Sequence, residues 1–217
     1  FYFTFYFALI SKFFSLKYIP IIHGGNIELR IKKSKWMTKF VFKNSDINIS
    51  PSKYIYNIFK NNNFEVIYIP NCINFSYYKF KKRLKIRPRL IWLRSFHEIY
   101  NPKMAINVLK IISTSFCETK LTMIGPDKDG SLNHCQRLSK KYGIEDNINF
   151  LGYLSKTEWI NISRDHDIFI NTSKIDNMPV SIIEMMALGL PVVSTDVGGI
   201  PFILEHGKNS LLVKNND

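Results

Sequence analysis

From residue 89 onward, short apolar runs alternate with longer segments in which apolar residues recur every three or four positions. Short apolar runs with polar borders are typical of strands buried in a parallel sheet, and the longer pattern is typical of amphipathic helices. The predicted strands are 90–93, 120–124, 148–151, 167–171, 191–194 and 211–213, and the predicted helices are 102–113, 132–142, 157–163 and 179–188, with another starting near Pro201. This alternation predicts a parallel sheet with helices on both faces and ligands at the carboxyl ends of its strands.

The first part of the chain repeats this pattern less regularly. Strands are predicted at 18–22, 46–50 and 65–69, and helices at 36–42 and from Pro51 onward. Residues 1–22 are largely apolar, but Lys12 and Lys17 interrupt the run that a membrane span requires. We therefore expect an internal helix followed by a strand in this stretch, rather than a membrane span or a signal peptide.

The stretch 171–207 combines these elements with candidate chemistry. Pro179 is suited to the first turn of a helix, and Gly189 to the left-handed residue that ends one. The carboxylates of Asp176 and Glu184 stand on either side of this loop–helix junction, with seven residues between them. Because a helix N-terminus presents free N–H groups and a positive dipole end, the junction is a candidate anion site.

This stretch resembles the signature of the retaining GT-B glycosyltransferases of family 4, also called group 1. The residues that carry the resemblance are Ser173, Asp176, Pro179, Glu184-Met185-Met186-Ala187-Leu188-Gly189-Leu190-Pro191-Val192-Val193 and Gly198-Gly199. The family pattern has Glu at the first acidic position, where this chain has Asp176. The resemblance covers about residues 18–217 and is strongest from Arg89 onward.

The resemblance implies an α/β fold of the GT-B type, with two Rossmann-like domains built on parallel sheets. We expect residues 1–78 to form an incomplete N-terminal, acceptor-side domain and residues 89–217 a donor-binding domain truncated at its C-terminal end. The basic run 79–88 is expected to be the linker between them. The chain begins with Phe1 rather than Met, which favours a fragment.

The family binds the donor diphosphate through basic side chains and through the start of a helix. Arg94, at the end of a predicted strand, matches the family arginine, and its alternative role is a surface salt bridge. Tyr100 falls in the slot of the family lysine, so the nearby Lys103 is the candidate substitute. The resemblance also assigns donor binding to Met178, Pro179 and Val180, of which Pro179 has no backbone N–H to donate.

Three further residues take roles from the resemblance. Glu184 is expected to accept hydrogen bonds from the ribose hydroxyls of the donor, and its alternative is an outward-facing acid. Asp176 and His23 are the catalytic candidates, because the family places such residues against the donor sugar. The alternatives are an Asx-type loop residue for Asp176 and a structural histidine for His23. The segment Gly152-Tyr153-Leu154 matches the family segment whose backbone meets the nucleotide base.

Charge divides the chain unevenly. Residues 1–90 contain 17 Lys and Arg against three acidic residues, whereas residues 91–217 contain 13 against 14. A basic first part suits an anionic membrane or an anionic substrate, and compositional bias explains it equally well. Nucleic-acid binding is not expected, because no aromatic stacking platform or groove-reading motif accompanies the basic run.

No cofactor and no metal are expected from the sequence. It lacks the Asp-x-Asp motif of metal-dependent glycosyltransferases, a dinucleotide loop and a nucleophilic triad. Cys72, Cys117 and Cys135 lack metal-ligand spacing and are expected to be ordinary thiols in a reducing compartment.

The function that the resemblance implies is transfer of a hexose from a nucleoside diphosphate sugar to a hydroxyl acceptor, with retention and without a metal. The acceptor would be a glycan or lipid of the cell surface, and the enzyme cytoplasmic, with peripheral contact at the inner face of an anionic membrane left open. Two alternatives stay open: a non-catalytic remnant that binds nucleotide sugars, and a sugar-nucleotide 2-epimerase on the same scaffold.

Overall fold

The structure is a computed structural model that describes residues 1–214 and divides into two compact units. Unit 1 comprises Phe1–Cys72 with two later segments, Ile175–Met178 and Gly198–Ile203. Unit 2 comprises Ile73–Lys174, Pro179–Val197 and the chain from Leu204 onward. The sequence suggested domains 1–78 and 89–217 with a linker between them, whereas the structure groups residues 73–88 with unit 2.

Unit 2 alternates strands and helices along the chain. Its strands are β3 (Arg89–Leu93), β4 (Lys120–Ile124), β5 (Ile148–Gly152), β6 (Ile168–Asn171), β7 (Val192–Thr195) and β8 (Leu211–Val213). Its helices are α5 (Pro102–Ser113), α6 (Ser131–Tyr142), α7 (Lys156–Ser163) and α8 (Val180–Ala187), with short 3-10 turns η1 (Phe75–Tyr77), η2 (Glu98–Tyr100) and η3 (Glu145–Asn147). The predicted strands and helices of this part are confirmed to within one or two residues.

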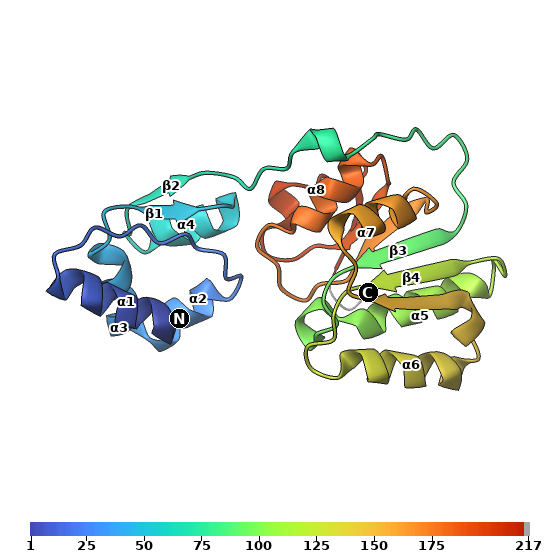
Figure 1. Cartoon of the computed structure of the whole chain (residues 1–217), viewed down its shortest axis with the longest axis horizontal. Coiled ribbons are helices and arrows are strands. Elements are labelled where there is room, and N and C mark those ends of the chain that lie inside the picture. Colours follow the sequence, from blue (N-terminus) through green and yellow to red (C-terminus); the bar gives the residue numbers. More distant parts are fainter. Residues whose placement is uncertain (215–217) are drawn as a thin grey trace. The chain divides into compact units, whose positions relative to one another are not determined.

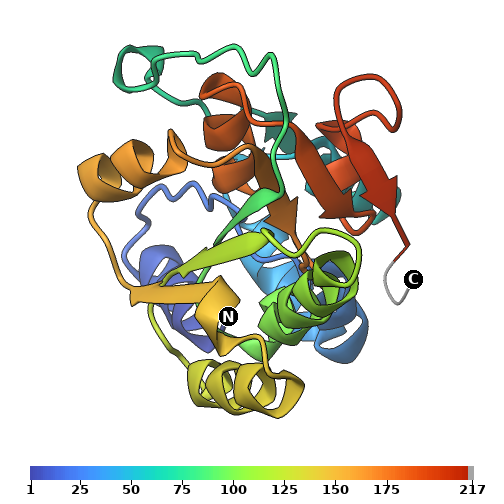
Figure 2. The ribbon, with the colours of Figure 1, turned by 90° about the vertical axis from the view of Figure 1, so that its right-hand side faces the viewer.

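The six strands of unit 2 form one parallel sheet in the order β5-β4-β3-β6-β7-β8. Helices α5 and α6 cover one face, while α7 and α8 lie on the other (Figure 1). The same two layers are visible when the molecule is turned by 90° (Figure 2). The strand order reverses between β3 and β6, and ligands of such sheets bind outside the carboxyl ends of the strands at that point.

The core of unit 2 explains why these elements pack. The middle of β3 is fully buried, and Trp92 has no exposed surface. Helix α5 turns Ala105, Ile106 and Leu109 inward, at the spacing of three and four that the sequence showed. Burying a side chain of the size of Leu or Ile stabilises a fold by about 1.5–3 kcal/mol, so this apolar layer holds the strands in place.

Unit 1 is smaller and mostly helical. It contains α1 (Tyr2–Phe13), α2 (Ile27–Lys33), α3 (Lys35–Lys43), β1 (Asn48–Ser50), α4 (Lys53–Asn61), β2 (Val66–Tyr68) and η4 (Ile200–Phe202). Strands β1 and β2 pair in parallel, and α4 begins after Ser52, whose hydroxyl accepts a hydrogen bond from the Ile55 N–H at 3.1 Å. The expected helix in the first 17 residues and those at 36–42 and after Pro51 are confirmed; helix α2 was not expected.

Two expectations about elements are wrong. Residues 18–22 form no strand but a single parallel bridge, Ile21 to Ile49, in which the Ile49 N–H donates to the Pro20 carbonyl at 2.9 Å. Pro20 lacks an N–H, which leaves this ladder short. The expected helix near Pro201 is only the 3-10 turn η4.

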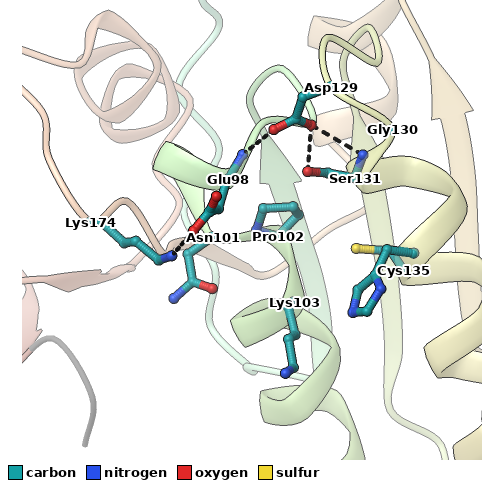
Figure 3. A pocket seen from close by; sticks show the side chains of 10 residues that line it. Glu98, Asn101, Pro102, Lys103, Asp129, Gly130, Ser131, Cys135 and Lys174 are labelled. Atoms are coloured by element: carbon teal, nitrogen blue, oxygen red, sulfur yellow. Dashed lines mark hydrogen bonds and ion pairs between the residues drawn. The ribbon is translucent and has the colours of Figure 1, made fainter.

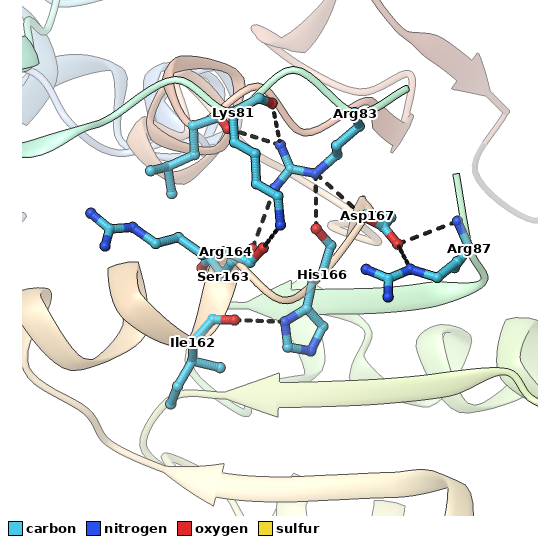
Figure 4. A network of polar contacts seen from close by, with 9 residues as sticks. Lys81, Arg83, Arg87, Ile162, Ser163, Arg164, His166 and Asp167 are labelled. Carbon is cyan, nitrogen blue, oxygen red and sulfur yellow. Dashed lines mark hydrogen bonds and ion pairs between the residues drawn. The ribbon is translucent and has the colours of Figure 1, made fainter. Parts of the chain in front are cut away.

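The basic segment 79–88 is bound along unit 2 by its arginine and lysine side chains (Figure 4). The Arg83 guanidinium donates to the carbonyls of His166 and Leu188, both at 2.9 Å, and lies 3.7 Å from the Asp167 carboxylate. Arg87 Nε donates to Asp167 Oδ2 at 2.8 Å. These contacts make the segment part of the unit, rather than a solvated connection.

The helices of residues 1–214 are all too short or too polar to cross a bilayer, the apolar α1 being 12 residues long. The candidate membrane span at residues 1–22 therefore folds as a short helix followed by an extended segment.

Candidate functional site

Hydrogen bonds link the carboxyl ends of β3 and β6 at the point where the strand order reverses. Trp92 of β3 donates its indole N–H to the Thr172 hydroxyl at 2.9 Å. The Thr172 hydroxyl in turn donates to the Tyr100 carbonyl at 2.8 Å, which joins β6 to the turn after β3. This chain of hydrogen bonds fixes the segment that carries Arg94.

Arg94 follows β3 directly and is partly buried. Its guanidinium lies over the Tyr100 ring, 4.7 Å from the centroid. Burial lowers the pKa of Arg94 from its ordinary value, although an arginine stays protonated in proteins. A charge removed from water and backed by an aromatic face attracts an anion more strongly than an exposed one does. Tyr100, which the sequence suggested for the slot of the family lysine, thus packs its ring against Arg94.

Lys103 lies elsewhere, in a pocket of about 410 Å³ between the starts of α5 and α6. Asn101 and His134 share this pocket, and Arg94 is not part of its lining. Figure 3 shows the Lys103 side chain in this pocket, while Asp129 accepts hydrogen bonds from the Glu98 and Ser131 N–H groups. The pocket that Lys103 lines therefore does not include Arg94.

Helix α8 starts at Val180, with Pro179 as its N-cap residue and no side-chain cap. The first N–H groups of a helix have no acceptor within it, so the start of α8 offers donors and a positive dipole end to an anion. The Ser181 side chain is buried, and its hydroxyl has no hydrogen-bond partner within residues 1–214. Sequence reasoning missed Ser181, although a lone hydroxyl inside an apolar run was a usable signal.

Glu184 lies on α8 with its side chain 12% exposed. The Tyr78 hydroxyl donates to its Oε1 at 2.6 Å, and Lys156 Nζ lies 3.3 Å from the same atom. Sequence reasoning did not find either partner, because Tyr78 stands in the predicted acceptor-side domain and Lys156 at the start of α7. Glu184 is neither an unpaired buried acid nor a fully outward-facing one.

Asp176 and Met178 belong to unit 1, where a glycine pair packs against their segment. A Cβ on Gly198 would stand 2.0 Å from the Asp176 carbonyl oxygen, and one on Gly199 would stand 1.6 Å from that of Asn177. Gly199 also donates its N–H to the Asp176 carbonyl at 3.0 Å. Only glycine permits this approach, so the Gly-Gly motif shapes the loop that presents Asp176.

His23 is exposed and belongs to the same unit as Asp176. The turn after it contains Gly25, whose Cβ, if present, would stand 3.1 Å from the Ile175 side chain. The structure therefore places the His-Gly-Gly turn and the Asp176 loop within unit 1, and Arg94, Val180 and Glu184 within unit 2.

Gly152 ends β5 with a positive φ of 63°, and its carbonyl accepts a hydrogen bond from Gly125 N–H at 2.7 Å. Tyr153 after it is largely exposed. Residues 1–214 contain no cluster of three or more His, Cys, Asp or Glu that would hold a metal ion.

Comparison with protein families gives a match over residues 78–217 to the family described as glycosyl transferases group 1. The putative colanic acid biosynthesis glycosyltransferase WcaL of Salmonella typhimurium is 37% identical over 86 residues, which are 37% of this chain and 21% of that protein. The D-inositol 3-phosphate glycosyltransferase of Mycolicibacterium smegmatis is 32% identical over 81 residues, which are 37% of this chain and 19% of that protein. The matched stretch thus spans about a fifth of the length of these relatives.

Solved structures show the same fold. The Anabaena protein Alr3699/HepE, crystallised with UDP, aligns with a TM-score of 0.80 at 16% identity, over 99% of this chain and 63% of that one. Sucrose-phosphate synthase from Thermosynechococcus elongatus aligns with a TM-score of 0.76 at 16% identity, over 93% of this chain and 56% of that one. The expected α/β fold of the GT-B type is confirmed.

Proposed function

Because this chain belongs to the group 1 glycosyl transferases, we propose that its full protein transfers a hexose from a nucleoside diphosphate sugar to a hydroxyl acceptor, retaining the anomeric configuration. The observation that carries the proposal is Arg94 at the strand-order reversal, in the unit that also holds the open N-terminus of α8 and Glu184. The UDP and UDP-glucose in the Alr3699/HepE structures support a nucleotide-sugar donor.

In the proposed reaction, the bond between the anomeric carbon and the donor phosphate breaks while a bond to the acceptor oxygen forms on the same face. The departing diphosphate takes the acceptor proton. Negative charge grows on the diphosphate, and Arg94 and the N–H groups of Val180 and Ser181 stabilise it. Because these groups neutralise the diphosphate, we propose that the reaction needs no metal. Asp176 and His23 would face the sugar.

Nucleotide binding is the first test. Calorimetry of the full-length protein against UDP-, GDP- and ADP-sugars is expected to identify one preferred base. Arg94→Ala and Glu184→Ala are each expected to weaken that binding by more than about tenfold, because each removes a charged hydrogen-bonding partner, an interaction of about 1.5–3 kcal/mol. Arg137→Ala, on the exposed face of α6, is the matched control and should bind normally.

Binding that survives both Arg94→Ala and Glu184→Ala would contradict the site. Transfer activity in the presence of a chelator tests metal independence, and loss of activity that a divalent cation restores would contradict it.

The second candidate function is binding of a nucleotide sugar without transfer. Asp176 favours it, because its carboxylate is one methylene shorter than that of the family glutamate and already accepts the Asn177 N–H at 2.9 Å. Asp176→Glu distinguishes the two functions. If the short side chain of Asp176 limits a transferase, the Asp176→Glu variant should turn over faster than the wild type. A protein that only binds the nucleotide sugar should release no product in either form.

A further inference from the structure

Glu184 is held by two donors from separate segments of unit 2, and both act on the same oxygen. The Tyr78 hydroxyl donates to Oε1 at 2.6 Å, and Lys156 Nζ lies 3.3 Å from it. Within residues 1–214, no hydrogen bond is made to Oε2. Resting on the proposed function, we infer that Tyr78 and Lys156 are positioning residues that turn Oε2 of Glu184 toward the two hydroxyls of the donor ribose.

The lone pairs of the carboxylate support this arrangement. An ionised carboxylate offers about two acceptor sites on each oxygen. Tyr78 and Lys156 fill those of Oε1, and the two sites on Oε2 stay available. A ribose presents two neighbouring hydroxyl donors, so the open sites of Oε2 match a diol in number.

Burial makes Tyr78 the more rigid of the two partners. Tyr78 is 6% exposed, and its ring packs 6.4 Å from that of Trp159, itself buried. Burial raises the pKa of Tyr78, and its hydrogen bond to Glu184 adds to the rise, so the hydroxyl keeps its proton and acts as a donor. A donor fixed by packing orients the carboxylate before a ligand arrives, which lowers the entropic cost of binding.

Lys156 approaches the same oxygen from the solvent side. Its side chain is 47% exposed, and its ammonium lies 5.2 Å from the centre of the Tyr78 ring. The neighbouring Tyr78 and Glu184 side chains raise the pKa of Lys156, so it is charged at neutral pH. Because solvent screens this contact, we expect Lys156 to contribute less than Tyr78 does.

The test compares two probes, the nucleoside diphosphate that the full-length protein prefers and its 2′,3′-dideoxy analogue. Calorimetry of Tyr78→Phe is expected to show about five- to tenfold weaker binding of the ribose form, the loss of one hydrogen bond. Binding of the dideoxy form should not change, since it has no hydroxyls for Glu184. Lys156→Gln should follow the same pattern with about a two- to threefold loss.

The neighbouring Tyr77 supplies the matched control, because its ring is exposed and its hydroxyl makes no hydrogen bond to Glu184. Tyr77→Phe should bind both probes like the wild type. If Tyr78→Phe does not fold, Lys156→Gln provides the test, because the Lys156 side chain is half exposed and its substitution should not disturb folding.

Equal weakening of both probes by Tyr78→Phe would overturn the inference, because it would mark a general packing role. Unchanged binding of both probes would overturn it as well. If Glu184→Gln abolishes the preference for ribose while Tyr78→Phe and Lys156→Gln keep it, the inference fails and the proposed function stands. If the wild type binds neither probe nor any nucleotide sugar, the proposed function fails.

Discussion

Asp167 is a buried carboxylate of unit 2 that two arginines contact. Its side chain is 2% exposed and lies 3.7 Å from Arg83, which is 3% exposed, and 2.8 Å from Arg87. Burial by itself would raise the pKa of Asp167, but the hydrogen bonds and charge of Arg87, with the charge of Arg83, lower it below its ordinary 3.8. The carboxylate is therefore ionised at neutral pH and anchors the segment 79–88.

Asp167→Asn is expected to lower the free energy of unfolding by about 3–5 kcal/mol at pH 7, because it leaves the buried Arg83 guanidinium without the carboxylate that compensates its charge. A lowered pKa in the folded state stabilises the protein above the ordinary pKa. That contribution is lost as the pH falls from about 4 through the lowered value. Urea unfolding between pH 7 and pH 3 measures both effects.

The exposed Asp146 provides the control. Asp146→Asn should unfold like the wild type at each pH, whereas Asp167→Asn should lose less stability on acidification than the wild type does. Parallel acid profiles for the wild type and Asp167→Asn would contradict the role given to the buried carboxylate.

Among the elements, the neighbouring ends of β3 and β4 decide where Arg94 lies. Gly125 follows β4 with a φ of 150°, and a Cβ there would stand 1.8 Å from the Arg94 carbonyl oxygen. Arg94 also donates its N–H to the Ile124 carbonyl at 3.0 Å. The two strand ends can approach this closely only because residue 125 has no side chain.

Gly125→Ala is expected to push the end of β3 away and to displace Arg94. We predict at least about tenfold weaker binding of the nucleotide sugar, the equivalent of about 1.4 kcal/mol, together with lower stability. Gly143→Ala is the matched control, because Gly143 also has a positive φ, 64°, but no atom lies within 4 Å of its Cβ position. It should cost about 1 kcal/mol of backbone strain and leave binding unchanged. Normal binding by Gly125→Ala, measured by calorimetry, would count against this explanation.

At the scale of the whole molecule, charge and exposed aromatic surface gather in the first part of the chain. Residues 1–90 hold 17 Lys and Arg against three acids. Helix α1 exposes Phe3, Phe7 and Phe13, which are 76%, 55% and 81% exposed. Ten of these Lys and Arg and all three acids lie in residues 1–72, which belong to unit 1 with α1. An apolar helix face on a basic unit is typical of proteins that lie at an anionic bilayer surface, so we propose that the full protein contacts such a membrane.

The full-length protein is expected to bind phosphatidylglycerol vesicles at low salt and to lose that binding at high salt, because salt screens the basic side chains. Phe13→Ser should weaken binding, since it removes an exposed apolar group. Phe116→Ser is the control, because Phe116 is 54% exposed on unit 2. Vesicle co-sedimentation measures each case. Binding that is absent at low salt, or unchanged at high salt, would contradict membrane contact.

Sequence by itself determined most of unit 2. Its strands and helices follow from local spacing of apolar residues, and α5 and β4 have the predicted bounds. The carboxyl ends of parallel strands meet at one edge, so the sequence alone predicted that Arg94 lies at the edge where such sheets bind ligands, and the structure places it directly after β3. The short strands of unit 1 were less predictable: the missing N–H of Pro20 weakens the pairing expected at 18–22.

Only the tertiary structure decided which polar side chains contact one another. Tyr78 and Glu184 are 106 positions apart, and Arg87 and Asp167 are 80 apart, so no local pattern links them. Lys103 was a candidate by its place in the sequence, and the structure places it in the lining of a pocket that does not include Arg94. Backbone periodicity is a local property, whereas the partners of a charged side chain depend on how distant elements pack.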